Sequence, residues 1–285
     1  MKSRVVKLPM NNLQQQLEPV LANPEFELPL LPSVGAEVIA LTQSDDTDAK
    51  ALAQLIQRDV SLAGHVMRIA NSAAYASRGQ VQTLQQAIAK LGMRQISDMA
   101  VALSVGESVF TSAAAMQDIL GYLWRHSLAT AMWSREIARA ARINSEVAFM
   151  CGLLHHVGKP VVVNQITLLG TNTSSQNEIL EAVENCHHIV GVSLVEKWQM
   201  PNSVLDTVKF VHAYSATESN RQMVSAVSAA SLLAENMLKA SLESNIADDK
   251  IKHILGQELN FYQEDVEVLI GKADAVLGET EAMAL

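Results

Sequence analysis

Apolar side chains along this chain recur at intervals of three and four positions, which places them on one face of a helix. Leu84, Ala87, Ile88 and Leu91 follow this spacing, and Gly92 stands where a helix commonly ends. The pattern predicts a short helix that stops at the glycine.

Polar residues that favour the first position of a helix precede several of these apolar segments. Thr47 or Asp48 is expected to cap one helix, Ser61 the next and Thr83 a third. Ser145 is expected to cap a helix farther along the chain. These capping residues indicate consecutive helices joined by short connections.

The second half of the chain carries longer helical segments. Trp124–Ala141 predicts one helix, and a later helix ends at His155-His156, before Gly158 and Pro160. A polar loop is expected over 172–176.

Ser175 and Glu178 have the spacing of a capping box, and Pro201 closes a helix that ends near Trp198. Further helices are expected from Ser203 to the C-terminus. The three valines at 161–163 are too short a run to predict a strand. No segment alternates as a strand does, so the fold class is predicted to be all-α.

Composition excludes several classes of protein. Hydrophobic residues make up 49% and charged residues 18%, which argues against a disordered chain. The net charge of −9 argues against a nucleic-acid or anionic-membrane binder. No apolar run is long enough for a transmembrane helix, and no secretory signal is found. With only two cysteines, the protein is expected to be reduced and cytoplasmic.

Two further helical faces have alternative interpretations. Ile96–Phe110 is almost uncharged and is expected in the core, although a partner-binding face is the alternative. Arg135, Arg139 and Arg142 share one face of a helix. That face is expected to be solvated; an acidic partner or a phosphate ligand is the alternative.

Histidines concentrate at helix ends in the second half and are the main candidates for chemistry. Neutral imidazole is a common ligand of Zn, Fe or Ni. A single divalent ion of this kind is one hypothesis, with Cys151 or Cys186 as a softer neighbour; histidines satisfied by backbone carbonyls are the alternative. The candidate ligands are His126, His155, His156, His187 and His212.

Several motifs resemble one known superfamily. GLLHHVGK, Gly152–Lys159, resembles the GLLHDIGK box of the HD superfamily of metal-dependent phosphohydrolases, and Arg125-His126-Ser127 resembles its first histidine. His187-x-x-x-Gly191 and Trp198-x-x-Pro201 resemble a segment shared with HDOD, the HD-related output domain. The N-terminal half resembles HDOD in Leu28-Pro29-x-Leu31-Pro32, Arg58-Asp59-Val60-Ser61-Leu62, Asn71-Ser72-Ala73-x-Tyr75 and Ala87-Ile88-x-x-Leu91-Gly92.

The resemblance spans about residues 28–215 and implies two packed helical lobes. The HDOD-specific lobe is expected over 28–115 and an HD-like bundle over 116–285. Residues 1–27 are expected to form a loose N-terminal extension.

The resemblance also implies a degenerate metal site. His126 and His155 match two metal ligands of catalytic relatives, but His156 replaces the aspartate of the His-Asp pair. Ser231 is the expected equivalent of the last aspartate, and Lys159 that of a phosphate-contacting lysine. Two dications would lack the charge compensation that carboxylates give, so no catalytic residue is assigned and no cofactor is required.

The predicted function is therefore a bacterial signalling module that is non-catalytic and acts through protein–protein contacts. Receivers, kinases or cyclic-di-GMP enzymes are the expected partners, in trans. A metal-dependent phosphohydrolase acting on nucleotides or cyclic dinucleotides is the alternative. A ligand sensor whose pocket is the degenerate site is the third hypothesis.

Overall fold

The computed structural model describes residues 12–23, 25–42, 48–111, 116–170, 175–239 and 246–284. Every regular element in these ranges is a helix, which confirms the all-α prediction. No helix among them has the length and apolar character needed to cross a membrane.

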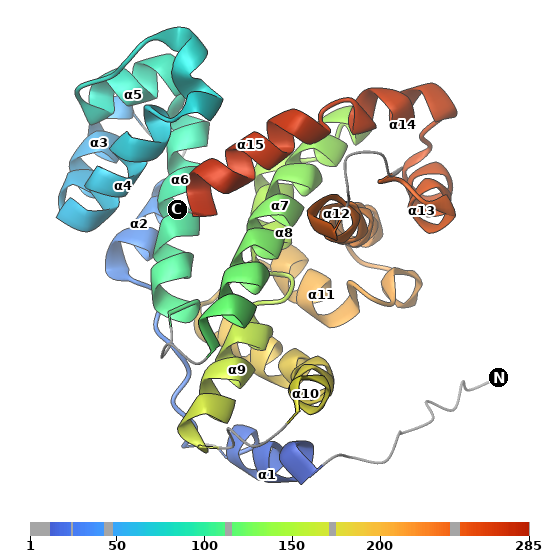
Figure 1. Ribbon diagram of the computed structural model, residues 1–285. Coiled ribbons are helices and arrows are strands. Elements are labelled where there is room, and N and C mark those ends of the chain that lie inside the picture. Colours follow the sequence, from blue (N-terminus) through green and yellow to red (C-terminus); the bar gives the residue numbers. More distant parts are fainter. Residues whose placement is uncertain are drawn as a thin grey trace.

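Helices from the first part of the chain gather at one end of the molecule, at the upper left of Figure 1, and α6 extends from them along the second part. They are α2 (Ser33–Thr42), α3 (Ala49–Gln57), α4 (Val60–Ala70), the 3-10 helix η1 (Ala73–Arg78), α5 (Leu84–Leu91) and α6 (Met93–Val109).

The starts of these helices follow the sequence closely, with one exception. Asp48 caps α3 and Thr83 caps α5, as predicted. The expectation that Ser61 caps the next helix was wrong, because Asp59 accepts the Leu62 N–H and α4 begins two residues earlier.

The remaining helices form a larger bundle. They are α7 (Gln117–Ala141), α8 (Ser145–Leu154), α9 (Gly158–Leu168), α10 (Gln176–Lys197), α11 (Asn202–Phe210), the 3-10 helix η3 (Tyr214–Ala216), α12 (Arg221–Lys239), α13 (Asp249–Leu259), α14 (Gln263–Ile270) and α15 (Ala273–Ala284).

Caps in this bundle again agree with the sequence, except at α8. Asn144 rather than Ser145 caps α8, since its side chain accepts the N–H groups of the first turn. The capping box of Ser175 and Glu178 is confirmed at the start of α10. Of the polar loop expected over 172–176, residues 172–174 lie outside the described residues, and Gln176 already belongs to α10.

The N-terminal segment differs from the loose extension expected for residues 1–27. Residues Asn12–Leu21 form helix α1, which packs on α10 and buries Leu13 and Leu17. The apolar pattern missed this helix because it is short and buries only two large apolar side chains.

The core runs continuously through both groups of helices. α6 packs on α2, α4 and α5 and also contacts α8, so the apolar segment 96–110 is core, as expected. Trp133 of α7 and Phe149 of α8 are among the largest fully buried side chains. The division into lobes at 115 and 116 remains a prediction, because the core shows no break there.

The last helix joins the two groups, as its diagonal path in Figure 1 shows: α15 packs on both α7 and η1. The expectation of a solvated arginine face was therefore wrong for Arg135, whose side chain is 4% exposed. Arg135 donates to Glu279 of α15 at 2.6 Å and to Gln95 of α6 at 3.0 Å. Arg139, on the same helix as Arg135, is 47% exposed.

Asp98 of α6 lies in the same buried network, 3.6 Å from Arg135. Burial raises the pKa of Asp98 to about 7, and Arg135 opposes this only in part. A carboxyl group with this shift binds its proton more tightly in the folded chain than in the unfolded chain. Its contribution to stability is therefore full below its ordinary pKa and is lost as the pH rises towards 7.

We expect the stability of Asp98→Asn relative to the wild type to rise by about 2 kcal/mol between pH 5 and pH 7. Urea unfolding of both chains at pH 5, 6 and 7 measures this difference. Titration of the histidines changes the unfolding free energy of both chains equally, so it cancels in the difference between them. If the difference in unfolding free energy between the two chains stays constant from pH 5 to pH 7, the pKa of Asp98 is not raised.

Candidate metal centre

Five histidines meet where α7, the end of α8 and α10 approach one another. His126 comes from α7, His155 and His156 from the turn after α8, His187 from α10 and His212 from the turn after α11. The structure thus brings together all five histidines that the sequence proposed.

Two glycines bring the backbones close enough for this meeting. A Cβ at Gly152 would lie 2.8 Å from the Ala131 Cα, so α8 packs directly on α7. A Cβ at Gly158 would lie 2.0 Å from the His187 carbonyl oxygen, so the start of α9 packs directly on α10. The Gly158 contact sets the turn that carries His156 beside His187.

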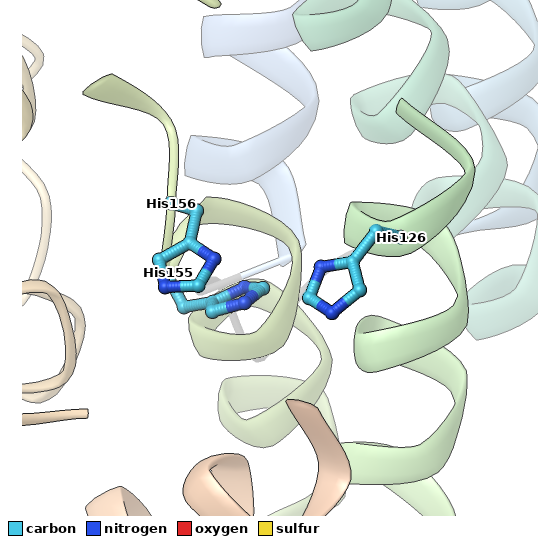
Figure 2. A group of neighbouring side chains, drawn as sticks. All are labelled: His126, His155 and His156. Carbon is cyan, nitrogen blue, oxygen red and sulfur yellow. The ribbon is translucent and has the colours of Figure 1, made fainter. Parts of the chain in front are cut away.

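The first group consists of His126, His155 and His156, whose ligand atoms lie within 4.8 Å of one another (Figure 2). All three side chains are buried. His155 Nδ1 donates to the Gly152 carbonyl at 2.7 Å, and Ser231 Oγ donates to His155 Nε2 at 3.2 Å. His126 Nε2 donates to the Ser231 carbonyl at 3.2 Å. This group is held by hydrogen bonds within the protein.

The second group consists of His156, His187 and His212, again with ligand atoms within 4.8 Å. His156 Nε2 and His212 Nε2 are 2.8 Å apart. The Nε2 of His187 is buried and has no hydrogen-bond partner among the described residues. His156 belongs to both groups, at the position where the resemblance implies an aspartate.

Glu184 also lies beside the second group, and the sequence did not identify it as a site residue. Its Oε1 lies 3.9 Å from His187 Nε2 and 3.9 Å from His212 Nε2, and its Oε2 lies 2.7 Å from Lys159 Nζ. The Glu-x-x-His spacing from 184 to 187 was the signal that could have found it, because residues three apart share a helix face. Lys159, proposed to contact phosphate, is paired with this carboxylate.

Burial keeps the clustered imidazoles neutral. It lowers the pKa of His126 to about 4 and holds the pKa values of His155 and His156 well below the ordinary value. Burial also lowers the pKa values of His187 and His212, and the Lys159 ammonium adds to the effect. Neutral imidazole is the form that binds metal ions.

The two cysteines suggested as neighbours lie away from the cluster, whereas the ring of His188 packs on that of His187, with centroids 4.0 Å apart. Cys151 is buried beside Thr207 and Ser203 of α11, and Cys186 is buried near Glu18 of α1. His188 hydrogen-bonds the Val208 carbonyl at 3.2 Å. Neither cysteine belongs to either histidine group.

The donor set fits one divalent ion better than two. The unpartnered Nε2 of His187 is the kind of buried atom that a metal ion satisfies. Neither histidine group contains a carboxylate, and Ser231, the expected equivalent of the last aspartate, supplies none to hold a second dication. A bound ion would act as a Lewis acid towards an oxygen ligand.

A cavity of about 800 Å³ opens beside the histidines. Its wall includes His126, His156 and His212, with Leu123 and Leu180 on the apolar side. The size is in the range of small-molecule sites, which run to roughly 300–1,000 Å³.

Comparison with known proteins gives a consistent result for the fold. The sequence profile of the HDOD domain family matches residues 28–214. A candidate metal-dependent phosphohydrolase of Shewanella amazonensis superposes with a TM-score of 0.72 at 18% identity, over 95% of this chain and 96% of the other. An HDOD domain protein of unknown function from Geobacter sulfurreducens gives 0.71 at 19% identity, over 95% and 96%. At these identities the likeness establishes the fold.

Two further similarities involve longer proteins. A candidate signal transduction protein of Marinobacter aquaeolei superposes with a TM-score of 0.67 at 19% identity, over 98% of this chain and 62% of that one. An uncharacterized protein of Treponema pallidum is 22% identical over 218 residues, which is 72% of this chain and 42% of the relative. The chain therefore spans less than half the length of that curated relative.

Proposed function

The chain belongs to the HDOD domain family, as its motifs predicted, and we propose that it acts as a non-catalytic signalling module through contacts with other proteins. The name of the Marinobacter aquaeolei structure supports a signalling context for this fold. Receiver, kinase and cyclic-di-GMP proteins are the partner classes proposed.

The chemistry of the two histidine groups is the main support for a non-catalytic role. Hydrolysis of a phosphodiester by two metal ions needs both ions held about 3.5–4 Å apart around the attacking and leaving oxygens. Bridging carboxylates supply both oxygen ligands and negative charge for such a pair. Here the bridging position carries His156 and the distal position carries Ser231, neither of which supplies charge.

The direct test is hydrolysis of bis(p-nitrophenyl) phosphate and of cyclic di-GMP, with Mn²⁺, Fe²⁺ or Zn²⁺ added. We expect no turnover above that of His155→Ala. His156→Asp alone is also expected to be inactive, because position 231 still lacks a carboxylate. Turnover by the wild type that is lost in His155→Ala would overturn the proposal in favour of the phosphohydrolase alternative.

The signalling part of the proposal is tested with purified partners. Receiver domains, histidine kinases and cyclic-di-GMP enzymes from the same genome are mixed singly with the chain and separated by size exclusion. At least one is expected to co-elute as a stoichiometric complex. If none does, the choice of partner classes is wrong.

The cavity beside the histidines favours a second candidate function, ligand sensing. Its apolar wall and polar histidine end suit a small molecule with one polar end. A ligand bound there would bias contacts elsewhere only if it bound two conformations with different affinity.

A further inference from the structure

The Nε2 atom of His187 is a buried polar atom whose hydrogen-bonding capacity is not satisfied. The side chain is 1% exposed, and this nitrogen has no hydrogen-bond partner among the described residues. Leaving such an atom unpaired in the interior costs about 1–3 kcal/mol. The nearby acceptor, Glu184 Oε1, is 3.9 Å away, which is too far for a hydrogen bond.

In the first histidine group, by contrast, the nitrogens of His155 and the Nε2 of His126 are already hydrogen-bonded within the protein. His155 uses both nitrogens, one towards Gly152 and one towards Ser231. His126 Nε2 must carry a proton, because its partner is a carbonyl oxygen. A metal ion on His155 Nε2 would have to displace the Ser231 hydroxyl, and one on His126 Nε2 would have to break the bond to the carbonyl.

Glu184 offers the second group what the first lacks, a negative charge with a fixed direction. Lys159 holds Oε2, and this leaves Oε1 turned towards His187 and His212. Hydrogen-bonded outer groups of this kind orient a ligating carboxylate. The ammonium and carboxylate also cancel in charge, so an incoming dication meets little net repulsion.

We propose that this chain binds one divalent metal ion through His156, His187, His212 and Glu184, and not through the His126–His155 pair. Ligands of one zinc ion, at bonds of about 2.0–2.2 Å, lie roughly 3–3.5 Å from one another. The observed separations of 2.8 Å for the His156–His212 nitrogens and 3.9 Å for the Glu184 contacts bracket that range. Glu184 is 54% exposed, so its side chain has room to close the gap.

Three imidazoles and one carboxylate suit Zn²⁺, Co²⁺, Fe²⁺ or Ni²⁺ better than Mg²⁺ or Ca²⁺. His156 and His212 share one proton in their hydrogen bond, and both Nε2 atoms are free for the ion once the donor ring carries its proton on Nδ1 instead. The site would lie at the cavity wall, because His156, His212 and Glu184 all line the cavity.

The test is titration of the full chain with Zn²⁺ by calorimetry, and with Co²⁺ by visible absorption, after removal of metal with a chelator. One ion per chain is expected. Glu184→Gln should weaken binding at least 10-fold and His187→Ala at least 100-fold, whereas His126→Ala should stay within about 3-fold of the wild type. His65→Ala is the matched control, because His65 is exposed on α4 and belongs to neither group.

Glu184→Gln keeps the test decisive if His187→Ala fails to fold, because residue 184 is half exposed. The proposal is overturned if the wild type binds no ion, if Glu184→Gln binds as the wild type does, or if His126→Ala alone abolishes binding. Each of these outcomes leaves the signalling function standing, since that function is judged on hydrolysis and complex formation.

Discussion

Replacing Arg135 with methionine is expected to lower the free energy of unfolding by about 3 kcal/mol. The guanidinium is 4% exposed and is the positive partner of Glu279, with Asp98 also close. Without it, Glu279 loses its ion pair, and a charged Asp98 would have no compensation in the interior. Loss of one partner of a buried pair is more costly than loss of both, because the remaining charge is left desolvated.

Thermal unfolding at pH 7 measures the effect, and a fall in the midpoint of about 5 °C is expected. Arg139→Met is the matched control on the same helix, because the Arg139 side chain is 47% exposed and its ion pair contributes less than about 1 kcal/mol. Glu279→Gln should cost less than Arg135→Met, since Glu279 is 26% exposed. Equal effects of Arg135→Met and Arg139→Met would show that burial of the arginine has no energetic consequence.

Gly158→Ala is expected to destabilise the chain by about 3 kcal/mol or more. The added methyl would lie 2.0 Å from the His187 carbonyl oxygen and 2.7 Å from the Gly191 nitrogen. Both are backbone atoms and cannot rotate away, so α9 must separate from α10. The same shift would move His156 away from His187.

The matched control is Gly64→Ala in the interior of α4, where an added methyl meets nothing within 4 Å. It should stabilise the chain by roughly 0.5–1 kcal/mol, because alanine favours the helix over glycine. Urea unfolding of both variants checks the pair. If Gly158→Ala unfolds at the same urea concentration as the wild type, the close approach of α9 and α10 has been misjudged.

Much of the fold was readable from local patterns. Asp48, Thr83 and the Ser175–Glu178 box mark helix starts because a cap acts on N–H groups two or three residues away. Asp59 was missed as the cap of α4, because Ser61 also precedes apolar residues and only the backbone shows that Asp59 is the extended residue.

The histidine cluster was found because histidines gather near the ends of helices. The resemblance to the HD superfamily then matched individual histidines to metal-ligand positions. Arg135 and Glu184 were misread or missed for a different reason. The partner of Arg135 lies 144 residues away, and no local pattern reports which helix covers a given face. In the sequence, Glu184 looks like any exposed helical glutamate. Its contacts with Lys159 and His212 form only in the folded chain, because those residues lie on other elements.

The dependence of Arg135 on α15 also constrains the order in which the molecule is completed. A ribosome adds residue 135 long before it adds residue 279, so the middle of α7 must wait with its guanidinium hydrated and its final neighbours missing. Closing a contact over so long a stretch of chain is slow, because the entropy of the intervening loop is lost before the contact forms. Newly made chains should therefore stay sensitive to protease near Arg135 until the last helix has been synthesised and has docked.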